Sequence, residues 1–108
     1  MRYDVQITRG AETDLTEILA FLVAREGETV AERILEGLLD AAASLGRFPE
    51  RGSHPRELLE LGIREFRQVI VQPYRLIYRI AGDQVFLLLV ADGRRDFQGL
   101  LERRVLRD

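Results

Sequence analysis

The sequence contains no cysteine, no tryptophan and no lysine among its 108 residues. The lack of cysteine excludes disulfide bonds, thiolate zinc sites and a thiol nucleophile. The lack of lysine excludes Schiff-base chemistry and the phosphate-binding lysine of a Walker motif. No apolar run approaches the ~20 residues that a bilayer span needs, and the N-terminus lacks the apolar stretch of a signal peptide. We therefore expect a cytoplasmic protein without membrane contact, metal or cofactor.

All 16 cationic side chains are arginines, and they are unevenly distributed. Residues 1–54 contain 6 arginines against 10 acidic residues, whereas residues 55–108 contain 10 arginines against 8. The formal net charge of −2 argues against binding duplex DNA by phosphate neutralisation alone, and we expect no such binding. The length and the 46% apolar composition suit a single domain over residues 1–108.

The N-terminal half predicts one strand followed by a helical hairpin. Residues 3–7 alternate apolar and polar side chains, which indicates a half-buried strand. Thr8 is a suitable N-cap, and apolar residues then recur at helical spacing over 11–22. Gly27 interrupts this pattern, which resumes over 30–45 and predicts a second helix.

The C-terminal half predicts a loop, three strands and a short helix. Prolines and glycine interrupt any periodicity over 47–62, so we expect an ordered loop there. Asp96 marks the approximate start of the last helix. The whole chain is thus expected to adopt an α+β fold with an N-terminal strand, a helical hairpin, a three-stranded antiparallel meander that completes the sheet and a short C-terminal helix, with helices on one face. The three strands are predicted at residues 63–71, 74–81 and 84–90.

The two-residue turn Gly82-Asp83 predicts the register of the last two strands. In that register Leu76 faces Leu89, Ile77 faces Leu88 and Arg75 faces Val90. One face, which includes Leu89, should pack on the helical hairpin. The other face mixes apolar side chains with arginines, and Arg64 joins it if the Gln72-Pro73 connection keeps the simple register. Either the C-terminal helix covers this face, or the face is left partly open for an extended or helical partner peptide. The residues predicted on this second face of the sheet are Arg75, Ile77, Arg79, Phe86, Leu88 and Val90.

Candidates for acid–base chemistry are few. RNA cleavage through a 2′-hydroxyl needs a base, an acid and cations near the scissile phosphate. His54 is the single histidine and sits in the predicted loop. Tyr74 and Tyr78 are expected to be packing residues with their hydroxyls at the edge of the core. Pairing of Arg94 and Arg95 with nearby aspartates is the simplest role for that charged cluster.

Six segments, in this order, resemble the RelE/ParE superfamily of bacterial toxins: residues 3–8, 11–18, 48–52, 62–66, 73–80 and 90–96. The likeness extends over nearly the whole chain. It implies the toxin of a type II toxin–antitoxin operon, as in plasmid stabilisation systems. A cognate antitoxin would neutralise it by wrapping its C-terminal segment around the helices and the sheet. The residues expected to contact the antitoxin are Leu15, Leu22, Arg75, Ile77, Arg79, Phe86, Leu88 and Val90.

RelE-like members of the superfamily are ribosome-dependent mRNA endonucleases, and this activity is the alternative hypothesis. Arg75 and Arg95 fall at plausible positions for the family's arginines. The lysines expected before Tyr74 are replaced by residues such as Phe66 and Gln68, and no tyrosine or histidine follows Arg95, so the catalytic set is incomplete. In this alternative, the phosphorane would be stabilised by Arg64, Arg75 and Arg95, with Glu65 or His54 as the base.

ParE-like members have a longer helical hairpin, as residues 10–45 suggest here, and poison DNA gyrase without cutting RNA. The favoured hypothesis is therefore a ParE-like toxin that binds gyrase and performs no covalent chemistry of its own. The first candidates for target contact are the C-terminal arginines Arg94, Arg95, Arg103 and Arg104. A third hypothesis retains the fold and the antitoxin but gives the protein another target or none.

Overall fold

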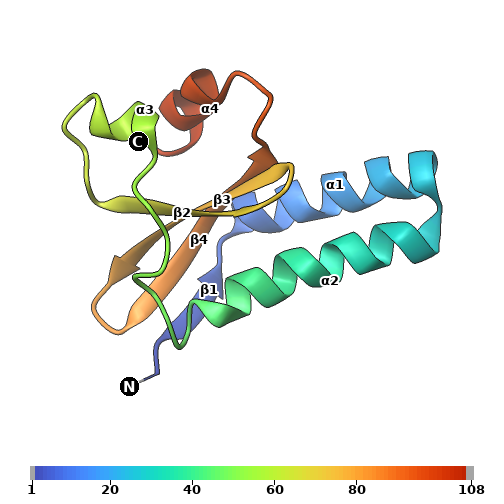
Figure 1. Ribbon diagram of the computed structural model, residues 1–108, viewed down its shortest axis with the longest axis horizontal. Coiled ribbons are helices and arrows are strands. Elements are labelled where there is room, and N and C mark those ends of the chain that lie inside the picture. The colour runs from blue at the N-terminus through green and yellow to red at the C-terminus, as the bar shows by residue number, and fades with distance from the viewer. Residues whose placement is uncertain (1, 107–108) are drawn as a thin grey trace.

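A four-stranded sheet separates two layers of helices (Figure 1). The hairpin of α1 and α2 forms one layer, and the two shorter helices α3 and α4 form the other. The computed structural model describes residues 2–106. In chain order the elements are β1 (Asp4–Ile7), α1 (Arg9–Glu26), α2 (Glu28–Ser44), α3 (Arg56–Leu59), β2 (Phe66–Val71), β3 (Tyr74–Ala81), β4 (Gln84–Asp92) and α4 (Phe97–Arg104). The α+β class is confirmed, but the prediction that helices lie on one face is wrong.

Local capping chemistry determines most of the helix boundaries. The Thr8 hydroxyl accepts a hydrogen bond from the Ala11 N–H at 3.3 Å, and the Asp96 carboxylate accepts one from the Gly99 N–H at 3.2 Å. Each bond satisfies one of the free N–H groups in the first turn of a helix. Gly27 has φ of 90°, a conformation that glycine adopts without steric cost, and so it allows the sharp turn from α1 into α2.

Helix α3 lies inside the segment predicted as a loop. The way this helix ends moves the start of β2 to a later residue than predicted. Gly62, with φ of 78°, closes the helix, because its N–H donates to Leu59 O and the Ile63 N–H donates to Leu58 O. This is the Schellman arrangement, including the apolar contact between its two ends. The backbone of Ile63 is therefore used by the helix, and β2 begins at Phe66 instead of residue 63.

The strand order in the sheet is β1-β4-β3-β2. Strand β1 pairs with β4 in parallel, whereas β2, β3 and β4 form the predicted antiparallel meander. The turn at Gly82-Asp83 pairs Ala81 with Gln84 as predicted. Strand β4 therefore connects the N-terminal strand to the C-terminal half of the chain. The Thr8 hydroxyl, for example, donates a hydrogen bond to Leu87 O, 79 positions later in the sequence.

A β-bulge in β4 changes the predicted register. Tyr78 pairs with Leu87, but Ile77 pairs with Leu89, so Leu88 is an extra residue. A shift by one residue exchanges the two faces of a strand. Val90 consequently packs in the core under the hairpin and Leu89 in the opposite core. The predicted pairs Leu76-Leu89, Ile77-Leu88 and Arg75-Val90 are therefore wrong.

The two faces of the sheet bury two separate apolar cores. Under α1 and α2 the core contains Leu38, Leu45 and Tyr78, together with residues from β4. Under α3 and α4 it contains Ile77 and Leu101. The second face is thus filled at its centre by the chain itself, which agrees with the first of the two alternatives above, cover by the C-terminal helix. Among residues 2–106, no helix has the length and hydrophobicity to cross a membrane.

Candidate functional site

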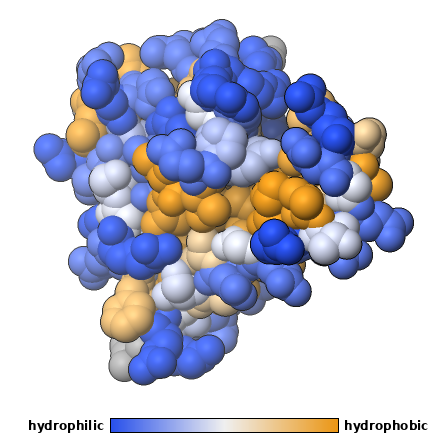
Figure 2. Space-filling view, turned by 45° about the vertical axis from the view of Figure 1, so that its right-hand side comes forward, coloured by the Kyte–Doolittle hydropathy of each residue, from blue (hydrophilic) through white to orange (hydrophobic). Residues whose placement is uncertain are grey.

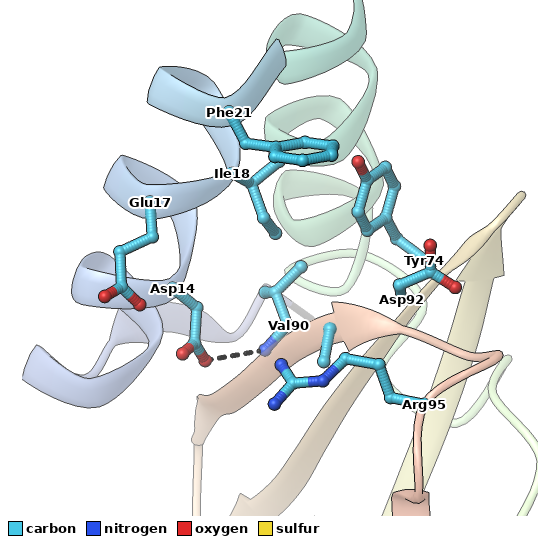
Figure 3. A pocket seen from close by; sticks show the side chains of 9 residues that line it. Asp14, Glu17, Ile18, Phe21, Tyr74, Val90, Asp92 and Arg95 are labelled. Atoms are coloured by element: carbon cyan, nitrogen blue, oxygen red, sulfur yellow. Dashed lines mark hydrogen bonds between the residues drawn. The ribbon is translucent and has the colours of Figure 1, made fainter. Parts of the chain in front are cut away.

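A pocket of about 330 Å³ lies between α1 and the C-terminal half of β4 (Figure 3). Ile18 and Phe21 of α1 line one side, and Tyr74 of β3 and Val90 of β4 line the other. Polar groups complete the walls, namely Asp14, Glu17, Asp92 and Arg95. The pocket can therefore accept an apolar group while presenting charged groups beside it.

The pocket borders an edge of β4 that β1 does not reach. The parallel pairing ends at Leu87, and within residues 2–106 no strand continues it. Side chains occupy part of this edge instead. The Val90 N–H donates to the Asp14 carboxylate at 3.0 Å, and the Arg104 guanidinium donates to Leu88 O at 3.3 Å. Polar side chains thus satisfy backbone groups that would otherwise be free to pair with another strand.

Asp14 and Arg104 also bind each other. Two guanidinium nitrogens of Arg104 donate to the two Asp14 carboxylate oxygens, at 2.9 and 3.1 Å. Gly10 leaves room for this pair, because a Cβ there would lie 2.7 Å from Arg104 Nη2. A bidentate pair of this kind fixes orientation as well as distance. It fastens the end of α4 to α1, so Arg104 has a structural role.

A second ion pair lies at the rim of the pocket. Arg94 Nε and Nη2 donate to the two carboxylate oxygens of Asp92, at 2.9 and 2.6 Å. These bonds lower the pKa of Asp92 from its usual 3.8 to about 2. The predicted pairing of Arg94 with an aspartate is confirmed. Burial, aided by the charge of Asp92, raises the pKa of the Tyr74 hydroxyl, which therefore stays protonated and can donate a hydrogen bond.

We expect the Asp92 carboxyl to titrate near pH 2 in an NMR experiment. Because its folded pKa lies below the unfolded value, the ion pair stabilises the protein above pH 3.8, and this contribution is lost as the pH falls towards 2. The variant Arg94→Gln removes the main cause, so its Asp92 should titrate closer to 3.8. A midpoint that is the same in both proteins would contradict this assignment.

Arg75 is held between the sheet and the two short helices. Its guanidinium donates to both Glu57 carboxylate oxygens, at 2.8 and 2.9 Å, and to Gln68 Oε1 at 2.8 Å. It also stacks 3.9 Å above the ring centroid of Phe97. The bonds from Arg75 lower the pKa of Glu57 despite its partial burial. The charge of Arg75 is therefore compensated internally.

Within residues 2–106, no hydrogen bond or ion pair joins any two of the five ribonuclease candidates. Arg75 packs against α3 and α4, whereas Arg95 lines the pocket beside α1. His54 lies at the outer edge of β2, where its Nδ1 donates to a backbone carbonyl at 3.0 Å. Arg64 and Glu65 are exposed and precede β2, so Arg64 does not join the strand face as predicted. Tyr78 is a packing residue as expected.

The four C-terminal arginines differ in their surroundings. Arg94 and Arg104 are engaged by Asp92 and Asp14, as described above. In the part of the chain that the structure describes, Arg95 and Arg103 form no ion pair and are exposed. Arg95 faces the pocket, and Arg103 lies in the last turn of α4. Arg95 is therefore available to a ligand of the pocket, whereas Arg103 is available to a partner that contacts the end of α4.

The residues predicted to contact an antitoxin are also divided. Ile77 is fully buried beneath α4, so its prediction as a surface contact is wrong. Val90 is buried as well, although it lines the pocket. Leu15 and Leu22 are buried with 8% exposure each, and Leu22 lines a neighbouring hollow beside Phe21. The remaining candidates are Arg75, whose charge is compensated, and the half-buried Arg79, Phe86 and Leu88.

Sequence reasoning missed Phe21, Asp14 and Glu57 as residues of functional interest. The sequence does contain a signal for Phe21. Residues 18–24 are all apolar, whereas a helix that packs on a core with a single face needs apolar side chains on that face only. Asp14 and Glu57 gain their roles from Arg104 and Arg75, which lie far from them in sequence. No local pattern identifies those partners.

Comparison with known proteins identifies the family. The model of the ParE toxin of the type II toxin–antitoxin system parDE matches residues 5–97. The chain belongs to this family. Toxin ParE3 of Caulobacter vibrioides is 29% identical to it over 97 residues, which cover 90% of this chain and 93% of ParE3. The predicted membership of the RelE/ParE superfamily, on the ParE-like branch, is confirmed.

Two solved structures share the fold. A chain from the chromosomal ParDE toxin–antitoxin system of P. aeruginosa has a TM-score of 0.72 and 19% identity, covering 84% of this chain and 96% of that one. A chain from the RelBE2 toxin–antitoxin complex of Mycobacterium tuberculosis has a TM-score of 0.62 and 27% identity, covering 85% and 99%. This member of the ParE family is the toxin component of a type II toxin–antitoxin system.

Proposed function

We propose that this toxin inhibits DNA gyrase by binding it, without covalent chemistry of its own, until a cognate antitoxin neutralises it. Membership of the ParE family over residues 5–97 supports this proposal. The observation that favours it over RNA cleavage is that the five ribonuclease candidates form no network: no hydrogen bond or ion pair joins any two of them within residues 2–106. Arg75 in particular has its charge compensated by Glu57 and is stacked on Phe97.

We place the gyrase contact at the exposed end of α4. Arg103 lies in its last turn, and its guanidinium is accessible to a large target. Planar guanidinium groups bind carboxylates and phosphates with two parallel hydrogen bonds, which suits a protein surface or a protein–DNA complex. Arg94 and Arg104 are less suited to this role because Asp92 and Asp14 occupy them.

The test uses toxin released from its antitoxin in a gyrase supercoiling assay. We expect the wild-type protein to inhibit supercoiling, and Arg103→Glu to need about tenfold more protein, the equivalent of ~1.4 kcal/mol in target affinity. Arg33→Glu is the matched control, since Arg33 is exposed on α2, a helix of the layer on the opposite face of the sheet from α4. It should inhibit as the wild type does.

The same preparations are added to a translation extract to follow transcript integrity. Ribosome-dependent cleavage of mRNA, without any effect on supercoiling, would contradict the gyrase proposal and favour the RelE-like alternative. In that case Arg75→Ala and Arg95→Ala would show whether the predicted arginines take part in cleavage. Inhibition of supercoiling with intact transcripts is the expected result.

A further inference from the structure

A groove separate from the pocket described above lies between α1 and α2. It has a volume of about 240 Å³. A helix turns by about 100° per residue, so the α1 residues that line this groove face away from those that line the pocket. Leu39 of α2 lies at the groove and keeps 39% of its surface exposed. The apolar residues that line the groove are Ile7, Leu15, Leu19, Leu35 and Leu39.

Four exposed carboxylates follow one another along α2 beside the groove, at intervals of four residues: Glu28, Glu32, Glu36 and Asp40. Residues three positions apart are neighbours on a helix, so Glu32 lies beside Leu35, and Glu36 lies beside Leu39. Glu12 of α1 lines the groove from the other helix. The apolar residues of the groove are therefore bordered by carboxylates, much as the apolar band in Figure 2 is bordered by hydrophilic groups. Apolar surface with a polar border is typical of protein contact sites.

The charge of this acidic border is not compensated: within residues 2–106, none of its five carboxylates forms an ion pair. Like charges four residues apart repel each other and destabilise a helix. The helix dipole favours an acidic residue in the first turn, such as Glu28, but opposes one near the C-terminal end, such as Asp40. Residues 9–44 contain 8 acidic residues against 3 arginines, whereas the rest of the chain contains 10 against 13. The border therefore destabilises the free protein, and a cationic partner would offset this.

We infer that this groove binds a basic amphipathic helix of a protein other than the antitoxin. A helix fits because the groove runs between two helices, and the rows of side chains on such helices accept a third helix packed along them. Apolar side chains on one face of the partner helix contact Leu19 and Leu39. Lysines or arginines beside that face pair with Glu32 and Glu36 on one side and with Glu12 on the other.

The charges of the molecule decide among the possible occupants. A second copy of this chain is disfavoured, because it brings the same carboxylates to the contact. Arg95 and Arg103 attract acidic segments to the pocket and to the end of α4, whereas the groove attracts a basic one, so these surfaces suit different partners. The partner of the groove therefore binds the toxin–antitoxin complex as well as the free toxin. This inference does not depend on the gyrase proposal.

The test uses the toxin purified in complex with the antitoxin of the neighbouring reading frame, and a labelled synthetic peptide as the probe. The peptide is a helix of about 18 residues with leucines along one face and lysines on both sides of them, the pattern of a helix that docks in a groove. A second peptide carries glutamate in place of every lysine. In fluorescence anisotropy, we expect the basic peptide to bind at least about tenfold more tightly than the acidic one, with a difference that shrinks as salt is added.

Charge reversal on α2 should reverse this preference. In the double variant Glu32→Arg, Glu36→Arg, the basic peptide should bind about tenfold more weakly than to wild type, and the acidic peptide more tightly. Glu60→Arg is the control for charge, because Glu60 is exposed at the end of α3, in the other helix layer. Leu39→Gln should weaken the basic peptide about tenfold, whereas Leu61→Gln, at a residue 53% exposed outside the groove, should not. Equal losses in a variant and its control would show non-specific attraction and would overturn the inference.

Binding to the free toxin identifies the occupant of the groove. If the basic peptide binds the free toxin but not the complex, the antitoxin occupies the groove, and the assignment to another protein is wrong. Absence of binding to both also contradicts the inference. Thermal unfolding checks the variants: the double charge reversal replaces repulsion along α2 by attraction, so its melting temperature should be no lower than that of wild type. The single variant Glu36→Arg serves if the double variant does not fold, and a folded variant that keeps the wild-type preference overturns the inference.

Discussion

A Glu57→Gln variant is expected to lose about 2 to 3 kcal/mol of its free energy of unfolding. Arg75 and Glu57 have side chains only 13% and 25% exposed, and two hydrogen bonds join them. The amide of glutamine has nearly the same size but carries no charge, and one of its two oxygen positions becomes an N–H donor. The Arg75 guanidinium would then lie between α3 and α4 without a compensating carboxylate. Urea unfolding at pH 7 measures the loss.

The control for this substitution is Glu60→Gln, an exposed glutamate at the end of the same helix. Its unfolding free energy should stay within about 0.5 kcal/mol of wild type. A double-mutant cycle with Arg75→Gln isolates the pair, and a coupling energy above about 1 kcal/mol is expected. Strictly additive losses would show that Glu57 stabilises the protein through contacts other than Arg75.

Lowering the pH should remove the stabilisation that the Arg75–Glu57 ion pair provides. The hydrogen bonds from Arg75 lower the pKa of Glu57 below its usual 4.5. The stabilisation is therefore complete above that value and declines as the pH falls through the lowered folded pKa. Wild type should consequently lose more stability between pH 5 and pH 3 than Glu57→Gln does, in unfolding curves recorded at each pH.

Gly52→Ala is expected to cost about 2 to 3 kcal/mol because it overfills a closed space. A Cβ at this position would lie 2.5 Å from Gln68 O and 2.5 Å from the Tyr78 hydroxyl oxygen. Gln68 O is backbone and accepts a ladder-like bond from the Ser53 N–H, so it has little freedom to move. The Tyr78 hydroxyl accepts from the Gly52 N–H at 3.1 Å and donates to Pro49 O at 2.6 Å. The substitution therefore disturbs the whole attachment of this loop to the sheet.

The same replacement at Gly37 should have the opposite sign. Gly37 lies within α2, and a Cβ there would meet nothing within 4 Å. Alanine favours the helix over glycine by about 1 kcal/mol, so Gly37→Ala should raise the melting temperature. Thermal unfolding of both variants compares them directly. Similar melting temperatures for the two would show that the space around Gly52 can expand.

Features set by local chemistry could be predicted from the sequence. Thr8 and Asp96 cap helices where expected, and Gly82 begins the turn that pairs Ala81 with Gln84. These outcomes depend on neighbouring residues and on the conformational freedom of glycine. The order of elements and the α+β class follow from them.

Features set by distant contacts could not be predicted. The bulge at Leu88 depends on how β4 fits between two cores, and the turn chemistry at Gly82 carries no information about it. Helix α3 has four residues, too few for a periodic signal, and its length is set by Gly62 and the packing of Leu58. The candidate pocket was missed for the same reason, because Phe21 and Arg95 meet there only after the sheet has formed.

The parallel pairing of the first strand with the last has a consequence for biosynthesis. Residues 4–7 are synthesised early, but β4, the strand that pairs with them, ends only at Asp92. In the same way, the ion-pair partner of Asp14 is Arg104, which is synthesised 90 residues later. A chain whose synthesis stops before β4 therefore cannot complete its sheet, its pocket or its last helix. Folding of the whole sheet therefore waits until translation has passed residue 92, although its first strand is among the earliest residues made.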